Sequence, residues 1–305
     1  MKRLIPWLCA LAILAGVLAP RAALGTVVVY GEASSSGPVI TVNVYADIPD
    51  AALLSFGIQL TYDSSLLYVK SAVKNTALWY FFDGTNPIPY IAPDTSIPGF
   101  VVVLGAKLDA SAPLQGVMGN RVLLGTVTFG RTPAVPPTSG YWFGLYLGRA
   151  ASFANFVATD GTVLDASTSA LSIKGVTIDP NDQNLNGLPD AWELAHFGAL
   201  GVTSWDADPD GDGFNNLQEY LADTDPNDGH SYPRLTGVTP HAGGVTLQWQ
   251  AGVNSTQYLQ RRLSLGSGDA WKDIFVSAPP TPTNGSYYDA FATNRATYYR
   301  LRFTR

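Results

Sequence analysis

Two twelve-residue segments of this 305-residue chain repeat one order of oxygen-bearing side chains. One segment runs from Asp182 to Glu193 and the other from Asp208 to Glu219. Each has oxygen-bearing side chains at positions 1, 3, 5 and 9, a glycine at position 6 and a glutamate at position 12. Calcium loops in proteins use this order, with a backbone carbonyl at position 7 and a glutamate that binds through both oxygens. The sequence therefore predicts two calcium ions, one in each segment.

The predicted ligands follow from the positions within each loop. Those of the first loop are Asp182, Asn184, Asn186, the Leu188 carbonyl, Asp190 and Glu193, and those of the second loop are Asp208, Asp210, Asp212, the Phe214 carbonyl, Asn216 and Glu219. The glycines at position 6, Gly187 and Gly213, allow the tight turn that such a loop needs. The second loop offers four carboxylates and the first offers three, so we expect the second to bind calcium more tightly. A chance pattern in an acidic linker is the alternative.

Acidic residues gather around the two loops. Residues 179–228 contain twelve of the 24 acidic residues and no lysine or arginine, in a chain of formal net charge −6. Such a block repels itself unless cations neutralise it. The acidity also argues against nucleic acid as a partner, because phosphate-binding surfaces are basic.

Residues 1–25 have the organisation of a secretory signal peptide. Two basic residues at positions 2 and 3 precede an apolar run from Leu4 to Leu18, and Ala23-Leu24-Gly25 offers a cleavage site. The run is short for a membrane span, so we expect cleavage, no span in the mature chain, and a location outside the cell or at its surface. A retained membrane anchor is the alternative. Because Cys9 is the single cysteine, the mature chain would form no disulfide.

The remaining patterns predict a mainly β protein in three parts. Residues 26–176 are expected to form a β-sandwich, residues 177–230 a small calcium module, and residues 231–305 a smaller β-sandwich. Residues 39–45 and 56–62 alternate apolar and polar side chains, which is the period of a half-buried strand. Further strands are expected at 26–30, 100–108, 122–129, 141–147, 152–157 and 170–176, and in the last part at 244–249, 257–261, 271–275 and 296–303.

Two short helices are expected in the calcium module, each beginning near the end of a loop. The first is predicted from about Pro189 to Phe197, and the second from Asn215 or Asn216. The residues before Asp182 favour strand and turn. Each unit is therefore expected to be a loop followed by a helix, without an incoming helix.

The paired loop–helix units resemble dockerin modules and the calcium repeats of thrombospondin type 3, and the loops themselves are similar to EF-hand loops. The segment from Glu219 to Pro226 is also similar to the tail of calcium repeats in secreted bacterial proteins. Two features depart from dockerins: position 12 is glutamate where dockerin loops usually have aspartate, and positions 10 and 11 of the two loops do not repeat each other. The resemblance thus implies calcium binding, but not the symmetric partner binding of dockerins.

Residues 26–176 resemble cohesin, the nine-stranded jelly-roll partner of dockerin. The resemblance is carried by residues 40–45, 56–69, 123–129 and 156–164. It implies a rigid module that binds a protein or a glycan in extracellular polysaccharide degradation. The last part is similar to a fibronectin type III domain, with Trp249 and Tyr299 where core aromatic residues are expected.

Aromatic clusters at residues 78–82 and 141–143 have two interpretations. They can form the core, which we favour because aromatic side chains dominate burial, or they can stack against sugar rings. On the second interpretation Trp79 and Tyr90 are the expected exposed residues.

No catalytic arrangement stands out in the sequence. The three histidines, His196, His230 and His241, lie in the later parts, and no serine has the pattern of a nucleophile elbow. We therefore expect a secreted, non-catalytic calcium-binding protein that binds a polysaccharide or a dockerin-type protein partner. A purely structural surface or matrix protein is the alternative, and a glycan-active enzyme is the third hypothesis.

Overall fold

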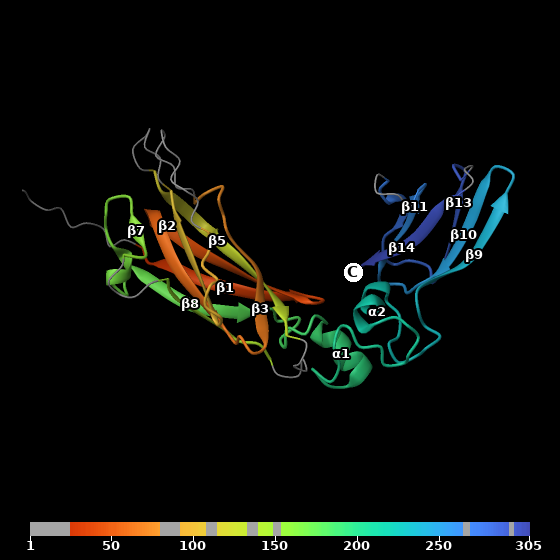
Figure 1. Cartoon of the computed structure of the whole chain (residues 1–305), viewed down its shortest axis with the longest axis horizontal. Helices are drawn as coiled ribbons and strands as arrows, with labels where there is room; N and C mark the ends of the chain where they lie inside the picture. The colour runs from red at the N-terminus through yellow and green to blue at the C-terminus, as the bar shows by residue number, and fades with distance from the viewer. Residues whose placement is uncertain are drawn as a thin grey trace, which may run out of the picture.

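The chain folds into two β-sandwiches with a short helical segment between them (Figure 1). The computed structural model describes residues 25–79, 92–107, 115–132, 140–148, 154–264, 269–292 and 296–305. The predicted fold class, mainly β with a small two-helix part, is confirmed. The signal-peptide prediction falls on residues 1–25, of which all but Gly25 lie outside the described residues, and so does Tyr90.

The first sandwich is built around one long strand. Its strands are β1 (Val27–Ser36), β2 (Val39–Tyr62), β3 (Leu67–Lys74), β4 (Phe100–Ala106), β5 (Val117–Arg131), β6 (Phe143–Leu147), β7 (Val157–Ala158) and β8 (Leu171–Ile178), and a 3-10 turn spans Leu164–Ala166. The first half of β2 pairs with β1 and β5, giving the order β3-β5-β2-β1-β8. The second half of β2 pairs with β4, β6 and β7. Because β2 belongs to both layers, it joins the two faces of the sandwich.

The alternation read from the sequence is the burial pattern of β2. Ile40, Val42 and Val44 are buried, and the residues between them are partly exposed. The described residues hold eight strands of the first sandwich, and the expected ninth is not among them. Strand β3 was not predicted; most of its side chains are at least partly exposed, so it lacks a simple alternation.

The sugar-stacking interpretation of Trp79 is wrong. Its side chain is fully buried, its ring meets Phe56 edge-on at 5.0 Å, and its indole N–H donates to the Leu123 carbonyl at 3.1 Å. Tyr141 is also buried, whereas Trp142 is 54% exposed. The core interpretation therefore holds for Trp79 and Tyr141, because each fills the space between the layers.

The second sandwich packs two three-stranded sheets. Its strands are β9 (Arg234–His241), β10 (Gly244–Gln250), β11 (Thr256–Arg262), β12 (Lys272–Ser277), β13 (Asn284–Asp289) and β14 (Tyr298–Thr304), in the orders β13-β10-β9 and β12-β11-β14. Leu247, Trp249 and Leu259 form the buried core, with Tyr299 packed against it. Trp249 and Tyr299 thus occupy the core positions expected of them. Strands β9 and β13 were not predicted.

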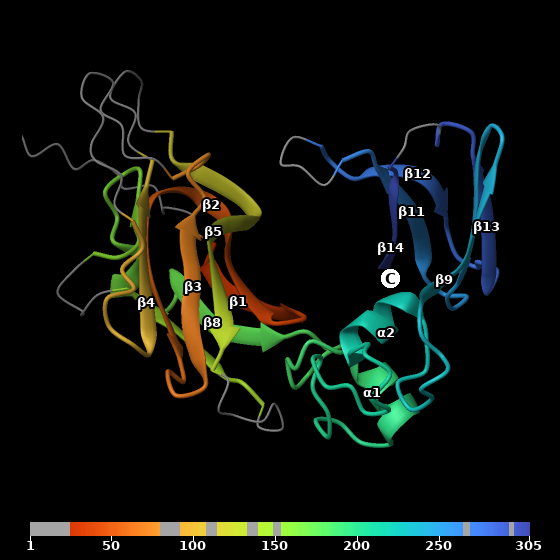
Figure 2. The same cartoon turned by 45° about the vertical axis from the view of Figure 1, so that its right-hand side comes forward.

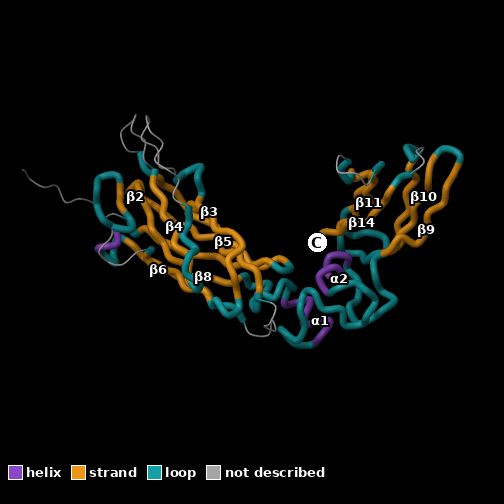
Figure 3. Tube along the Cα trace, viewed as in Figure 1, coloured by secondary structure: helices purple, strands orange, loops and turns teal. Residues whose placement is uncertain are grey.

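Two short helices connect the sandwiches, α1 (Asp190–Phe197) and α2 (Asn216–Ala222), both close to their expected positions. They lie between the two groups of strands (Figures 2 and 3). Trp192 of α1 meets Tyr220 of α2 edge-on at 6.0 Å, and the His196 ring lies 3.4 Å from the Asp225 carboxylate. None of the described helices is long and apolar enough to cross a membrane.

The first junction joins the first loop to the turn between β1 and β2. The Ser35 hydroxyl donates to the Asp182 carboxylate, and the Asp179 N–H donates to the Ala33 carbonyl at 2.8 Å. The partly buried Arg131 guanidinium donates to the carbonyls of Gly37 and Leu185. The loop is therefore fixed on the first sandwich by polar contacts from two of its strands.

The second junction joins α2 to the second sandwich. One Asp223 carboxylate oxygen accepts backbone N–H bonds from Val253 and Asn254, both at 2.9 Å. The Gly252 N–H donates to the Ala222 carbonyl at 2.9 Å, and Arg305 stacks over the Tyr220 ring at 4.9 Å. These contacts attach the end of α2 to a loop and to the last residue of the chain.

Candidate metal centre

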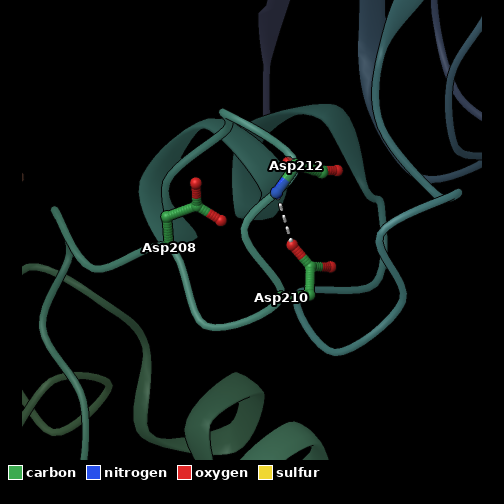
Figure 4. A group of neighbouring side chains, drawn as sticks. All are labelled: Asp208, Asp210 and Asp212. Carbon is green, nitrogen blue, oxygen red and sulfur yellow. Dashed lines mark hydrogen bonds between the residues drawn. The ribbon is translucent and has the colours of Figure 1, made fainter.

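The second loop, Asp208–Glu219, curls around a group of carboxylates. Ligand oxygens of Asp208, Asp210 and Asp212 all lie within 4.8 Å of one another (Figure 4). Backbone N–H groups inside the loop hold these side chains: Gly213 donates to Asp208 at 2.9 Å, and Asp212 donates to Asp210 at 3.2 Å. Of the described residues, these three form the one such group of acidic, histidine or cysteine side chains.

Four buried oxygens of the second loop accept no hydrogen bond. They are Oδ2 of Asp210, Oδ2 of Asp212, Oδ1 of Asn216 and Oε2 of Glu219. A buried oxygen without a partner is costly, and for a carboxylate the cost is larger. All four atoms belong to predicted ligand positions 3, 5, 9 and 12, so one cation bound to the loop would satisfy them together.

Two hydrogen bonds from the amide nitrogen fix the orientation of the Asn216 side chain. Its Nδ2 donates to the Thr203 hydroxyl and to the Ser204 carbonyl, both at 2.6 Å. Because the Ser204 carbonyl can only accept, the side chain must present its nitrogen on this side, and its Oδ1 is the atom left without a partner. This is the orientation that a metal ligand requires.

Glu219 enters the loop from the first turn of α2. Asn215 and Gln218 form a reciprocal capping box that starts this helix, and Glu219 follows directly. Its side chain is fully buried. Burial, and then the nearby carboxylates of Asp210 and Asp212, raise the pKa of Glu219 to about 8. A bound cation would favour the ionised form and reverse this shift.

The first loop, Asp182–Glu193, has the same order of positions but satisfies its own oxygens. The amide groups of Asn186 and Asn184 donate to the two oxygens of Glu193 at 2.8 and 3.2 Å, and the Gly201 N–H donates to it at 2.9 Å. Asp182 accepts from the backbone of Asn186 and Gly187. A single oxygen of this loop, Oδ2 of Asp190, is buried without a partner.

The two loops therefore differ in how well they suit a cation. In the second loop, three aspartates, an asparagine, a glutamate and the Phe214 carbonyl can supply up to seven oxygens if Glu219 binds through both of its atoms. In the first loop, Asn184 and Asn186 replace two of these aspartates, and calcium would have to displace amide groups from Glu193. Hard cations such as calcium prefer an all-oxygen set, so the second loop fits calcium better.

Glycine is required at position 6 of both loops. Gly187 and Gly213 have φ values of 95° and 96°, a region that favours glycine. A side chain at Gly187 would also lie 2.6 Å from the Gly37 carbonyl oxygen. The first loop could therefore not approach the first sandwich so closely with another residue.

Several residues that support the loops were not identified from the sequence. Thr203 and Ser204 orient Asn216, and the Thr224 hydroxyl donates to Glu219 at 3.3 Å. These polar residues flank the second loop, which is the signal that could have indicated them. Ser35 and Arg131 reach the first loop from strands far away in the chain, and no local pattern marks them.

Comparisons with known proteins give similarities of fold. No family model and no curated protein matches the chain. A cohesin from Clostridium acetobutylicum aligns with a TM-score of 0.35 and 16% identity, over 50% of this chain and 91% of its own. A type III cohesin from a cell-surface anchoring scaffoldin of Ruminococcus flavefaciens aligns with a TM-score of 0.37 and 9% identity, over 52% of this chain and 88% of its own. A chain of a type I cohesin–dockerin complex from Clostridium thermocellum aligns with a TM-score of 0.36 and 17% identity, over 51% of this chain and 100% of its own.

Proposed function

We propose that this chain is a calcium-binding, non-catalytic connector protein of the extracellular space. Calcium in the second loop would order a short module that holds two β-sandwiches in a fixed relation. The observation that carries the proposal is the group of four buried, unpartnered oxygens at ligand positions of that loop. The contacts of Asp182 with Ser35 and of Asp223 with Val253 support it, because they attach the module to a sandwich at each end.

Calorimetric titration of the calcium-depleted full chain with calcium tests this proposal. We expect binding at the second loop with the higher affinity and weaker binding at the first. Extracellular calcium modules commonly have a Kd of about 10⁻⁴–10⁻³ M, which suits an ion with a structural role. An Asp210→Asn variant should lose the tighter event, whereas Asp206→Asn, an exposed aspartate outside the loop, should keep it. A full chain that gives no calcium-dependent heat would contradict the proposal.

The first sandwich is proposed as the part that binds a partner. A dockerin-type protein or an extracellular polysaccharide remains the expected partner class, as the sequence resemblance implies. A purely structural surface or matrix protein is the alternative function. Two experiments separate these possibilities. Capture of a purified dockerin by the immobilised full chain tests for a protein partner, and retardation of the chain in gels that contain polysaccharide tests for a polysaccharide partner. A chain that binds neither would favour the structural role.

A further inference from the structure

A pocket of about 420 Å³ lies where the second loop and α2 meet the second sandwich. Its lining is mostly apolar and includes Phe214 of the loop, Leu221 of α2, and Leu235, Leu301 and Phe303 of the sandwich. This volume is within the range of pockets that bind ligands or partner side chains. The apolar part of this lining suits an apolar side chain.

Two of the residues that line the pocket are basic, in a protein of formal net charge −6. Arg234 and Arg302 line it, and none of the described lining residues is acidic. Arg302 stacks over the Tyr258 ring at 3.6 Å, and Arg234 stacks over the Tyr232 ring at 4.3 Å. Arg302 also pairs with the Asp273 carboxylate at 3.5 Å, and Nη1 of Arg234 donates to the carbonyls of His230 and Tyr232. Stacking fixes the planes of both guanidinium groups, and their remaining N–H groups can donate to a carboxylate. The ligand that complements this pocket has an apolar body beside negative charge.

The pocket also lies between two sheet edges. Strand β9 is an edge of one sheet and β14 is an edge of the other. Arg234 and Leu235 come from β9, while Leu301, Arg302 and Phe303 come from β14. An edge strand presents backbone N–H and C=O groups that an extended peptide can pair with, and its alternate side chains then enter pockets. This arrangement favours a peptide over a free small molecule.

One wall of the pocket depends on the proposed calcium site. Phe214 occupies position 7 of the second loop, where its carbonyl would bind the ion, while its ring stacks on Tyr232 at 5.6 Å and lines the pocket. Gln218 and Leu221 on α2 supply a second wall. A cation that orders the loop and starts α2 would therefore also set the shape of the pocket.

We propose that this pocket binds an extended peptide segment of a partner protein, in which apolar side chains alternate with acidic ones, and that binding requires calcium in the second loop. The apolar side chain enters between Leu221 and Leu301. The flanking carboxylates pair with Arg234 and Arg302. This inference rests on the proposed calcium site and names the chemistry of a partner for it.

Fluorescence polarisation of the full chain with a labelled peptide that alternates glutamate with leucine and phenylalanine tests the inference. We expect saturable binding in calcium, at least tenfold weaker after calcium removal and for Arg302→Gln. The matched control is Arg300→Gln, on the same strand, whose guanidinium stacks over Trp271 and lies outside the pocket. This variant should bind like the wild type. Calcium calorimetry and thermal unfolding of each variant establish that the site and the fold are intact.

Each outcome decides between the two proposals. A chain that binds calcium but not the peptide overturns the inference and leaves the calcium site standing. Equal binding of a peptide with lysine in place of glutamate, or of the peptide to Arg302→Gln, also overturns it. Displacement of the peptide by decanoate at equal concentration would show that a free carboxylic acid is the ligand, and would overturn the assignment to a protein segment.

Discussion

Replacing Glu219 by glutamine is expected to stabilise the calcium-free protein and to remove the stability that calcium gives through the second loop. In the absence of a cation, burial and the nearby carboxylates of Asp210 and Asp212 make an ionised Glu219 costly, so the folded protein must take up a proton there; a neutral amide avoids this cost. In calcium, the amide offers one oxygen where the carboxylate offers two. A site that binds only the folded state stabilises it by about 2.7 kcal/mol at 100 times Kd, and the variant should lose this gain. Thermal unfolding with and without calcium measures both effects.

The same carboxyl group makes the calcium-free protein sensitive to pH. Its pKa is raised from the ordinary 4.5 to about 8, so between these values the folded protein holds a proton that the unfolded chain has released. Stability of the calcium-free protein should therefore fall as the pH rises from about 5 to about 8. Glu219→Gln should flatten this dependence. An equal pH dependence of wild type and variant would contradict the assigned environment of Glu219.

Glu193→Gln is the matched control, because Glu193 occupies position 12 of the first loop. Its oxygens accept N–H groups from Asn186, Asn184 and Gly201. An amide at this position would direct its own N–H₂ against at least one of these donors. We therefore expect this variant to destabilise the calcium-free protein by about 1–3 kcal/mol, the opposite sign to Glu219→Gln. If both substitutions changed the stability of the calcium-free protein in the same direction, the result would contradict the difference in hydrogen bonding described for the two loops.

Replacing Arg131 by methionine is expected to cost about 3 kcal/mol and to release the first loop from the first sandwich. The guanidinium is partly buried and donates to the carbonyls of Gly37 and Leu185, one on each side of the junction. Methionine fills much of the space but leaves both carbonyls without these donors, and hydrogen bonds from charged groups are worth about 1.5–3 kcal/mol each. Denaturant unfolding measures the loss.

Arg121→Gln serves as the control for Arg131. Arg121 donates to the carboxylate of Glu32, but it does so on the surface, where its side chain is 55% exposed. Exposed ion pairs contribute about 0–1 kcal/mol, so this variant should be nearly neutral. If the two variants cost the same, the junction at Arg131 is not the stabilising contact described above.

Local patterns in the sequence were sufficient for the strands with strong alternation and for the grouping of Asp208, Asp210 and Asp212. Calcium loops are contiguous, so the spacing of Asp208, Asp210 and Asp212 already places their side chains together. Strands with weak patterns were missed. Strand β9 contains Gly237 and Pro240 and is largely exposed, and β13 begins with Asn284-Gly285, which is typical of a turn.

Contacts between distant parts of the chain could not be predicted from the sequence. Ser35 and Asp182 are 147 residues apart, and the Arg131 contact with Gly37 spans 94 residues. The difference in hydrogen bonding between the two loops could not be predicted from the sequence either. This difference depends on whether the amide groups of Asn184 and Asn186 point toward Glu193, and the spacing of residues in the sequence does not determine the orientation of side chains.

Hydrogen–deuterium exchange of the full chain, with calcium and after its removal, tests most directly whether an ion holds the second loop. The backbone N–H groups of Gly211, Asp212, Gly213 and Phe214 donate to the carboxylates that would bind it. We predict that these amides and those of α2 exchange at least tenfold faster without calcium, while the core strands β2 and β10 are unaffected. Equal exchange of the second loop in both conditions would contradict the account.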